Sequence, residues 1–287
     1  MANTMKKKIL VATDYSKNAW NALSYVIDLY AEVPCEFHLV HAYSTTGYAI
    51  DSMMVPEPGE LAYEQARDRA EKGMERWEKQ LEFRDTHPHH EFFYRLEFNS
   101  VLGAIKSEVE RHDIELVVIG TKGETDAADI LYGSHAVSVM EKIRNCPVLA
   151  VPTQVVYHPP KEIVFPTSYK THYKRRELQY LIEMAKLGGG AIRILHVDLE
   201  DELSAQQLQN KELLTECLEE VPISFHTMHD VDVVTAISCF IQARESDMIA
   251  FINKKHNFFE SLFNRPLVKE LGFNAQIPVL VMHDLRN

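Results

Sequence analysis

The feature that most constrains the fold of this 287-residue chain is an internal repeat. KKILVATDY near the start resembles KEIVFPTSY, and EFHLVHAY resembles AIRILHVD. NSVLGAIKSEVERHDIELVVIG has the layout of VDVVTAISCFIQARESDMIAFI, and NCPVLAVP matches QIPVLVMH. Because the matches keep their order and spacing, we infer one duplication of a whole domain. The double proline in residues 155–160 (VVYHPP) disfavours helix and marks a linker, which predicts domains over residues 1–154 and 155–287.

Each repeat alternates apolar runs rich in Ile and Val with segments of helical period. In the first half, strands are expected over residues 8–13, 36–42, 91–98, 114–120 and 147–151. Helices are expected over residues 16–30, 60–83, 101–112 and 134–143. The continuous apolar run IELVVIG is typical of a strand that is covered on both faces. The pattern predicts an α/β fold: two tandem, Rossmann-like domains, each with a five-stranded parallel sheet and helices on both faces.

Composition and charge exclude several classes of function. The net charge is −12, whereas a general nucleic-acid surface needs a basic face. A small anion site stays open, because backbone N–H groups can hold a phosphate locally. No stretch approaches the roughly 18–20 apolar residues of a membrane helix, and residues 1–14 fit a first strand better than a signal peptide. We therefore expect a cytoplasmic protein that binds neither nucleic acid nor membrane.

A glycine-containing loop follows the apolar strand LVVI. It has the form Gly120-Thr-Lys-Gly123, nine residues, then Gly133-Ser134. In doubly wound sheets ligands lie outside the carboxyl ends of the strands, and glycine lets a phosphate or another backbone approach closely. Ser134 is a good N-cap for the next helix, whose free amides would face an anion. Gly120 and Gly123 would give a ligand close access, and Gly133, Ser134 and the amides of His135 and Ala136 would hold phosphate oxygens.

The same loop also fits a purely structural interpretation, in which the glycines only shape a tight connection. It is not a Walker loop, which would need Gly-Lys-Ser/Thr, and it lacks the GxGxxG of dinucleotide folds. The loop alone therefore leaves both interpretations open.

Taken with the rest of the chain, the loop resembles the universal stress protein family in its ATP-binding branch. That branch carries Gly-x2-Gly-x9-Gly-Ser/Thr, which residues 120–134 fit without a gap. It also has a strand that ends in Thr-Asp, an apolar strand that ends in His, and a closing strand like PVLAVP. The first feature corresponds to Thr13-Asp14, the second to the stretch LVHA at residues 39–42, and the third to PVLAVP at residues 147–152. With the duplication counted, the resemblance covers nearly the whole chain and implies an adenine nucleotide α-hydrolase-like fold.

The resemblance implies that the first half binds ATP. Asp14 would hydrogen-bond near the nucleoside, and the backbone of Ala42 would meet the adenine edge. Lys122 would offset phosphate charge, although loop lysines are often only solvated. Mg²⁺ often accompanies the phosphates in this family, but no pattern here specifies a metal site independently. The implied nucleotide-binding residues are Ala12, Thr13, Asp14, Ala42, Ile119, Gly120, Lys122, Gly123, Gly133, Ser134, His135 and Ala136.

The second half departs from this pattern at its diagnostic positions. Ser168 replaces the aspartate, so the carboxylate is missing. Asn253 and His256 occupy the two early glycine positions. Pro266 and Leu267 replace the Gly-Ser pair, and proline supplies no N–H to a phosphate. The second domain is therefore expected to bind no nucleotide and to act as a structural or regulatory partner.

The resemblance implies a stress-response or signalling module, and the loss of the motif in the second half predicts one adenine nucleotide per chain. No residue is an obvious general base for a γ-phosphate, so at most slow ATP hydrolysis is expected. The family resemblance implies that the two domains pair as an intrachain pseudo-dimer, and two chains could associate further. The protein partner and the stress signal are not specified by the sequence.

Two alternatives come from other functional classes. The first is a nucleotide-free interaction module, in which the glycine loop is only structural. The second is an adenylating enzyme, although neither an SGGxDS-type nor a HIGH-type motif occurs. Pyrophosphate release with an acceptor would identify that enzyme.

Several histidines have a structural interpretation. His87, His89 and His90 form the stretch HPHH, which fits a surface loop better than a metal site because no further ligands are evident. His41 and His196 recur at equivalent strand ends, which favours a hydrogen bond that belongs to the fold over a catalytic role.

Overall fold

The computed structural model describes residues 6–44, 58–84, 86–123, 132–198, 202–253 and 277–283. It divides into two compact units, of which the first comprises Met1–Cys146 and Val151–Thr153 and the second Pro147–Ala150 and Gln154–Asn287. No helix of the described residues is long and apolar enough to cross a membrane.

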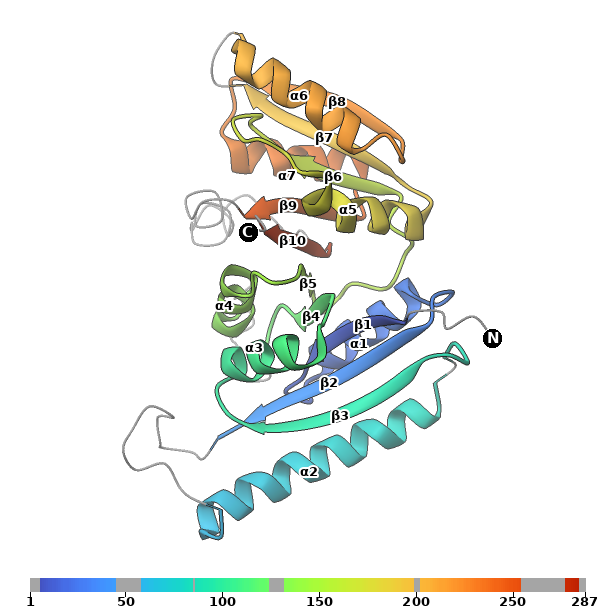
Figure 1. Cartoon of the computed structure of the whole chain (residues 1–287), viewed down its shortest axis with the longest axis vertical. Helices are drawn as coiled ribbons and strands as arrows, with labels where there is room; N and C mark the ends of the chain where they lie inside the picture. The colour runs from blue at the N-terminus through green and yellow to red at the C-terminus, as the bar shows by residue number, and fades with distance from the viewer. Residues whose placement is uncertain are drawn as a thin grey trace. The chain divides into compact units, whose positions relative to one another are not determined.

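The first half forms the predicted parallel α/β sheet (Figure 1). Its strands follow the order β3-β2-β1-β4-β5, and β1 pairs in parallel with β2 and β4. Most predicted ends lie within one or two residues of the observed ones. The strands are β1 (Lys7–Ala12), β2 (Cys35–Tyr43), β3 (Glu91–Phe98), β4 (Leu116–Gly120) and β5 (Val148–Val151). The helices are α1 (Lys17–Leu29), α2 (Leu61–Glu82), α3 (Val101–His112) and α4 (Ser134–Lys142).

The local sequence of α1 determines where the helix begins and which of its faces is buried. Ser16 is its N-cap, and the Ser16 side chain accepts a hydrogen bond from the Ala19 amide. Its apolar residues recur every three or four positions and are buried, as a helix covering a sheet requires. The helix ends at its C-cap, Tyr30, and β2 begins at Cys35.

The strand order creates a crevice between β1 and β4. The connections through α1 and α2 run outward from β1 to β2 and then to β3, whereas α3 returns the chain to β4 on the other side of β1. Right-handed crossovers that run in opposite directions cover opposite faces of a sheet. The carboxyl ends of β1 and β4 therefore flank the switch point at which such folds bind ligands.

The second half repeats this topology, which confirms the predicted tandem α/β fold. Its strands follow the order β10-β9-β6-β7-β8, and β6 pairs in parallel with β7 and β9. The strands are β6 (Glu162–Pro166), β7 (Ala191–Asp198), β8 (Ile223–His229), β9 (Met248–Asn253) and β10 (Val279–His283). The helices are α5 (Arg175–Gly188), α6 (Ala205–Cys217) and α7 (Val233–Arg244). Of the predicted replacements, His256, Pro266 and Leu267 lie outside the described residues.

The repeat extends to individual hydrogen bonds. His41 Nδ1 lies 2.8 Å from the carbonyl oxygen of Thr13, and His196 Nδ1 lies 2.9 Å from that of Thr167. Both histidines therefore tie the end of one strand to the end of its neighbour. The expectation of a hydrogen bond that belongs to the fold is confirmed.

Candidate functional site

A pocket lies at the carboxyl ends of β1 and β4, within the first unit. It contains about 620 Å³ of empty space, counting the part that is open to solvent. Every predicted nucleotide-binding residue except Ser134 lines it. The lining comprises Ala12, Thr13, Asp14, Ala19, Val40, Ala42, Val101, Ala104, Ile105, Ile119, Gly120, Thr121, Lys122, Gly123, Gly133, His135 and Ala136.

The loop after β1 holds Asp14 at the pocket through local hydrogen bonds. Thr13 Oγ1 accepts from the Tyr15 amide at 2.9 Å, and Asp14 Oδ1 accepts from the Ser16 amide at 3.0 Å. Such Asx and hydroxyl turns fix a short polar side chain against its own backbone. The Asp14 carboxylate is thereby positioned before any ligand arrives.

Tyr15, in the same loop, anchors it to α2. Its backbone is left-handed, with φ of +64°, and its ring stacks on His41 at 4.2 Å between centroids. The Tyr15 hydroxyl donates to the carbonyl of Ala70 at 2.7 Å, and burial raises the pKa of this phenol well above its usual range. Burial also lowers the pKa of His41, against the raising effect of its bond to Thr13, so a neutral imidazole supports the loop.

Gly120 is required by a close approach of α1. A Cβ at this position would lie 2.7 Å from Nδ2 of Asn18, closer than side chains tolerate. Asn18 uses that amide to donate to the Lys122 carbonyl at 2.9 Å. Gly120 therefore has a packing role in addition to its place in the pocket lining, as the purely structural interpretation of the loop anticipated.

The start of α4 differs from the prediction by one residue. Gly133, not Ser134, is the N-cap: its carbonyl accepts from the Val137 amide at 3.1 Å, and its own amide donates to Thr121 at 2.7 Å. That second bond ties Gly133 to the end of β4 and sets the helix to begin at Ser134, whose side chain is exposed. Because Gly133 carries no capping side chain, it leaves the first-turn amides to face an anion.

Sequence reasoning missed the wall that α3 contributes. Val101, Ala104 and Ile105 line the pocket, and they share the i, i+3, i+4 spacing of one helix face. That spacing was visible in the sequence, but which face meets the crevice depends on the strand order. Ala19, Val40 and Thr121 complete the lining that was not predicted.

In the second half, the equivalent loop is held by side chains of the same domain. The Thr167 hydroxyl contacts the hydroxyl of buried Tyr173. Gln207 Nε2 donates to the carbonyl of Ser168 at 2.9 Å, and Asn210 Nδ2 donates to the loop from the same helix, α6. Polar groups at the end of β6 therefore form hydrogen bonds within the second domain. This accords with the presence of Ser168 at the position equivalent to Asp14.

Comparison with known proteins agrees with this architecture. A model of the Universal stress protein family matches residues 5–152. The chain is 27% identical over 147 residues to the universal stress protein MJ0531 of Methanocaldococcus jannaschii, a span of 50% of this chain and 81% of that protein. A universal stress protein from Archaeoglobus fulgidus has the same fold, with a TM-score of 0.67, 17% identity and coverage of 96% of this chain and 95% of that chain. The functionally unknown protein PA1789 from Pseudomonas aeruginosa gives a TM-score of 0.55 at 12% identity, and the match covers 98% of this chain and 93% of that chain.

Proposed function

Because this chain belongs to the universal stress protein family, we propose that its first domain binds one molecule of ATP, with a divalent ion such as Mg²⁺, in the pocket described above. The observation that supports the proposal most is the convergence of residues far apart in sequence. The strand end at Thr13-Asp14, the strand end at Ala42 and both parts of the glycine loop surround one pocket.

The lining suits the two chemical parts of a nucleotide. Aliphatic side chains from β2, α3 and β4 offer an apolar surface for a flat base, as most ligand pockets do. Asp14 is a hydrogen-bond acceptor for ribose hydroxyl groups. The Lys122 ammonium and the first-turn amides of α4 offer positive charge and donors to phosphate oxygens.

We infer that the bound nucleotide acts as a signal rather than as a substrate in metabolism. Binding would bias the conformation or the partner choice of the two-domain unit. At most slow hydrolysis is expected, because the sequence offers no obvious general base for a γ-phosphate; within the described part of the chain, the pocket lining includes Asp14 and His135. The pairing of the two domains, the association of two chains and the identity of a protein partner stay predictions.

The substitution Asp14→Asn is expected to weaken ATP binding roughly 10- to 150-fold. Asparagine keeps an oxygen for the Ser16 amide, so the loop retains its shape, while one charged acceptor is lost. A hydrogen bond to a charged group contributes about 1.5–3 kcal/mol, which corresponds to that factor. Calorimetric titration of the full chain with ATP and Mg²⁺ measures the change.

The matched control is Ser168→Ala at the equivalent loop of the second domain. It should leave ATP affinity unchanged, because this loop is held by Gln207 from its own domain. If Ser168→Ala weakens binding while Asp14→Asn does not, the nucleotide site has been assigned to the wrong half.

A further inference from the structure

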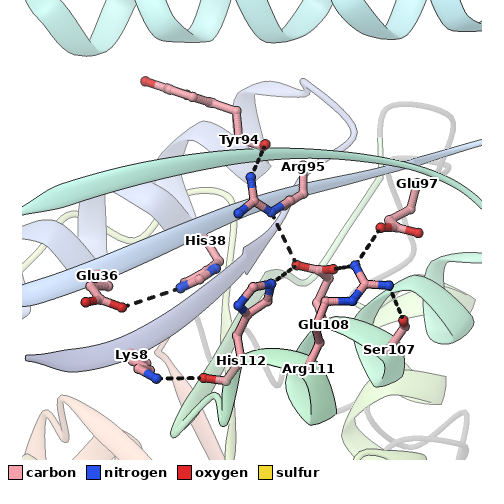
Figure 2. Close-up of polar contacts among 10 residues, drawn as sticks. All are labelled: Lys8, Glu36, His38, Tyr94, Arg95, Glu97, Ser107, Glu108, Arg111 and His112. Atoms are coloured by element: carbon pink, nitrogen blue, oxygen red, sulfur yellow. Dashed lines mark hydrogen bonds and ion pairs between the residues drawn. The ribbon is translucent and has the colours of Figure 1, made fainter.

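A second group of side chains with ligand chemistry lies apart from the pocket lining, between β2 and α3. His38 comes from β2, and Glu108 and His112 come from α3, four residues apart and therefore on one helix face. Each offers one ligand atom, and these atoms all lie within 4.8 Å of one another. Figure 2 shows His112 between the other two, with its ring directed toward Glu108.

These polar groups are buried without the hydrogen bonds that burial normally demands. His38 is 3% exposed and Glu108 is 0% exposed. Among the described residues, neither ring nitrogen of His38 has a hydrogen-bond partner, and Glu108 Oε2 and His112 Nε2 lie 3.4 Å apart without forming a hydrogen bond. A buried polar group without a partner destabilises the folded state, so such a cluster calls for an explanation.

The second domain shows that the fold does not require this arrangement. At the positions equivalent to His38 and His112 stand Arg193 and Arg244, and Phe240 stands in the place of Glu108. Arg193 Nε donates to Glu162 Oε2 at 2.7 Å, and Arg244 Nε donates to the same oxygen at 3.1 Å. Both repeats therefore hold charged pairs at this place, but only the first repeat also brings two imidazoles and a carboxylate together there.

The chemistry of the three side chains suits a transition metal ion. Imidazole nitrogens and carboxylate oxygens are ordinary ligands of such ions, and Arg95 and Lys8 leave the three ligand atoms of this group uncovered. Donor atoms at 2.0–2.1 Å from a tetrahedral Zn²⁺ lie about 3.4 Å apart. His112 Nε2 and Glu108 Oε2 are already 3.4 Å apart, whereas the widest separation in the group, within 4.8 Å, has to shorten when an ion binds.

We propose that His38, Glu108 and His112 form a binding site for one divalent first-row transition ion, with Zn²⁺ as its simplest occupant. Two imidazoles and one carboxylate leave the fourth position of a tetrahedral ion open to water or another ligand. The His112 side chain is 27% exposed, which gives the ion a path from solvent. The site is independent of the proposed nucleotide site, although α3 and β2 contribute to both.

The surrounding charges affect both the orientation of the Glu108 carboxylate and the affinity of the site for an ion. Arg111 pairs with Glu108 Oε1 and orients the carboxylate, which leaves Oε2 for the ion. Arg95 Nε lies 3.8 Å from Oε2, and its positive charge opposes a cation there. Glu36 Oε2 lies 3.9 Å from His38 Nε2, beyond hydrogen-bond distance, and its negative charge favours a cation nearby. We therefore expect a weaker site than one without neighbouring arginines.

The test is a calorimetric titration of the full, chelator-treated chain with Zn²⁺. One ion per chain is expected, and His112→Gln should lower the affinity for Zn²⁺ roughly 100-fold. Loss of a residue that only supports a metal ligand costs up to about 100-fold, and His112 would be a ligand itself. His112 is half-buried, so this variant should fold, which circular dichroism checks.

Two control variants separate this site from other histidines. His226→Ala removes the histidine near Arg193 in the second domain, and His87→Ala in combination with His89→Ala removes the surface stretch HPHH. Both controls should keep wild-type affinity, and Co²⁺ bound to them should give the visible absorption that His112→Gln lacks. The proposal is overturned if folded wild-type protein binds no Zn²⁺, if His112→Gln binds as tightly as wild type, or if the surface variant abolishes binding.

Discussion

The substitution Gly133→Val is expected to lower ATP affinity by at least about 100-fold while the protein stays folded. A branched side chain at the N-cap would crowd the space beside the first-turn amides of α4, where we place the phosphates. Losing two charge-assisted hydrogen bonds at about 1.5–3 kcal/mol each accounts for a loss of this size. The backbone tolerates valine, because Gly133 has φ of −66° and ψ of 156°.

Calorimetry with ATP measures the affinity of this variant, and Gly133→Ala provides a graded control. Alanine adds only a methyl group, so its effect should fall between those of glycine and valine. Thermal unfolding followed by circular dichroism checks that each variant keeps the native fold. Unchanged affinity in a folded Gly133→Val protein would remove the phosphate site from the start of α4.

The second large effect concerns stability: Trp77→Ala should destabilise the first unit by about 3–5 kcal/mol. Trp77 on α2 is 1% exposed and packs edge-to-face on Trp20, with ring centroids 5.2 Å apart. It also meets Tyr15, whose loop carries Asp14 at the pocket, with ring centroids 6.0 Å apart. Removing the indole leaves a cavity between α2 and the rest of the domain, so we also expect weaker ATP binding.

Urea unfolding followed by tryptophan fluorescence measures this change in the first unit alone. The chain has two tryptophans, Trp20 and Trp77, and both belong to the first half, so Trp20 still reports that unit in the variant. Phe83→Ala is the matched control, because Phe83 ends the same helix but is 90% exposed. It should change stability by no more than about 0.5 kcal/mol. Equal losses in both variants would show that α2 is not anchored through Trp77.

Much of the fold could be predicted because the duplication supplies two samples of one pattern. The apolar strand IELVVIG and its counterpart indicated strands covered on both faces, and the structure confirms them as β4 and β9. Element ends were less predictable, because hydrogen bonds distant in sequence set them. The bond from Gly133 to Thr121 moved the N-cap from Ser134, and no local propensity encodes that contact.

The nucleotide pocket was predictable only in part, because part of its lining depends on contacts between residues distant in sequence. Glycine spacing and the strand end at Asp14 identify loops that meet at one edge of a parallel sheet. The α3 wall and the His38, Glu108 and His112 cluster escaped notice because they depend on which residues of β2 and α3 face each other. The i, i+4 pair Glu108 and His112 was a local signal, but His38 joins it only through the three-dimensional packing.

The central claim is that one nucleotide binds per chain, in the first domain. Native mass spectrometry of the freshly purified full chain, with and without added ATP and Mg²⁺, tests it most directly. We predict a single added nucleotide per chain, and its loss in the Gly133→Val variant. Two nucleotides per chain would contradict the assignment of the second domain, and a folded protein that binds none would favour a nucleotide-free interaction module.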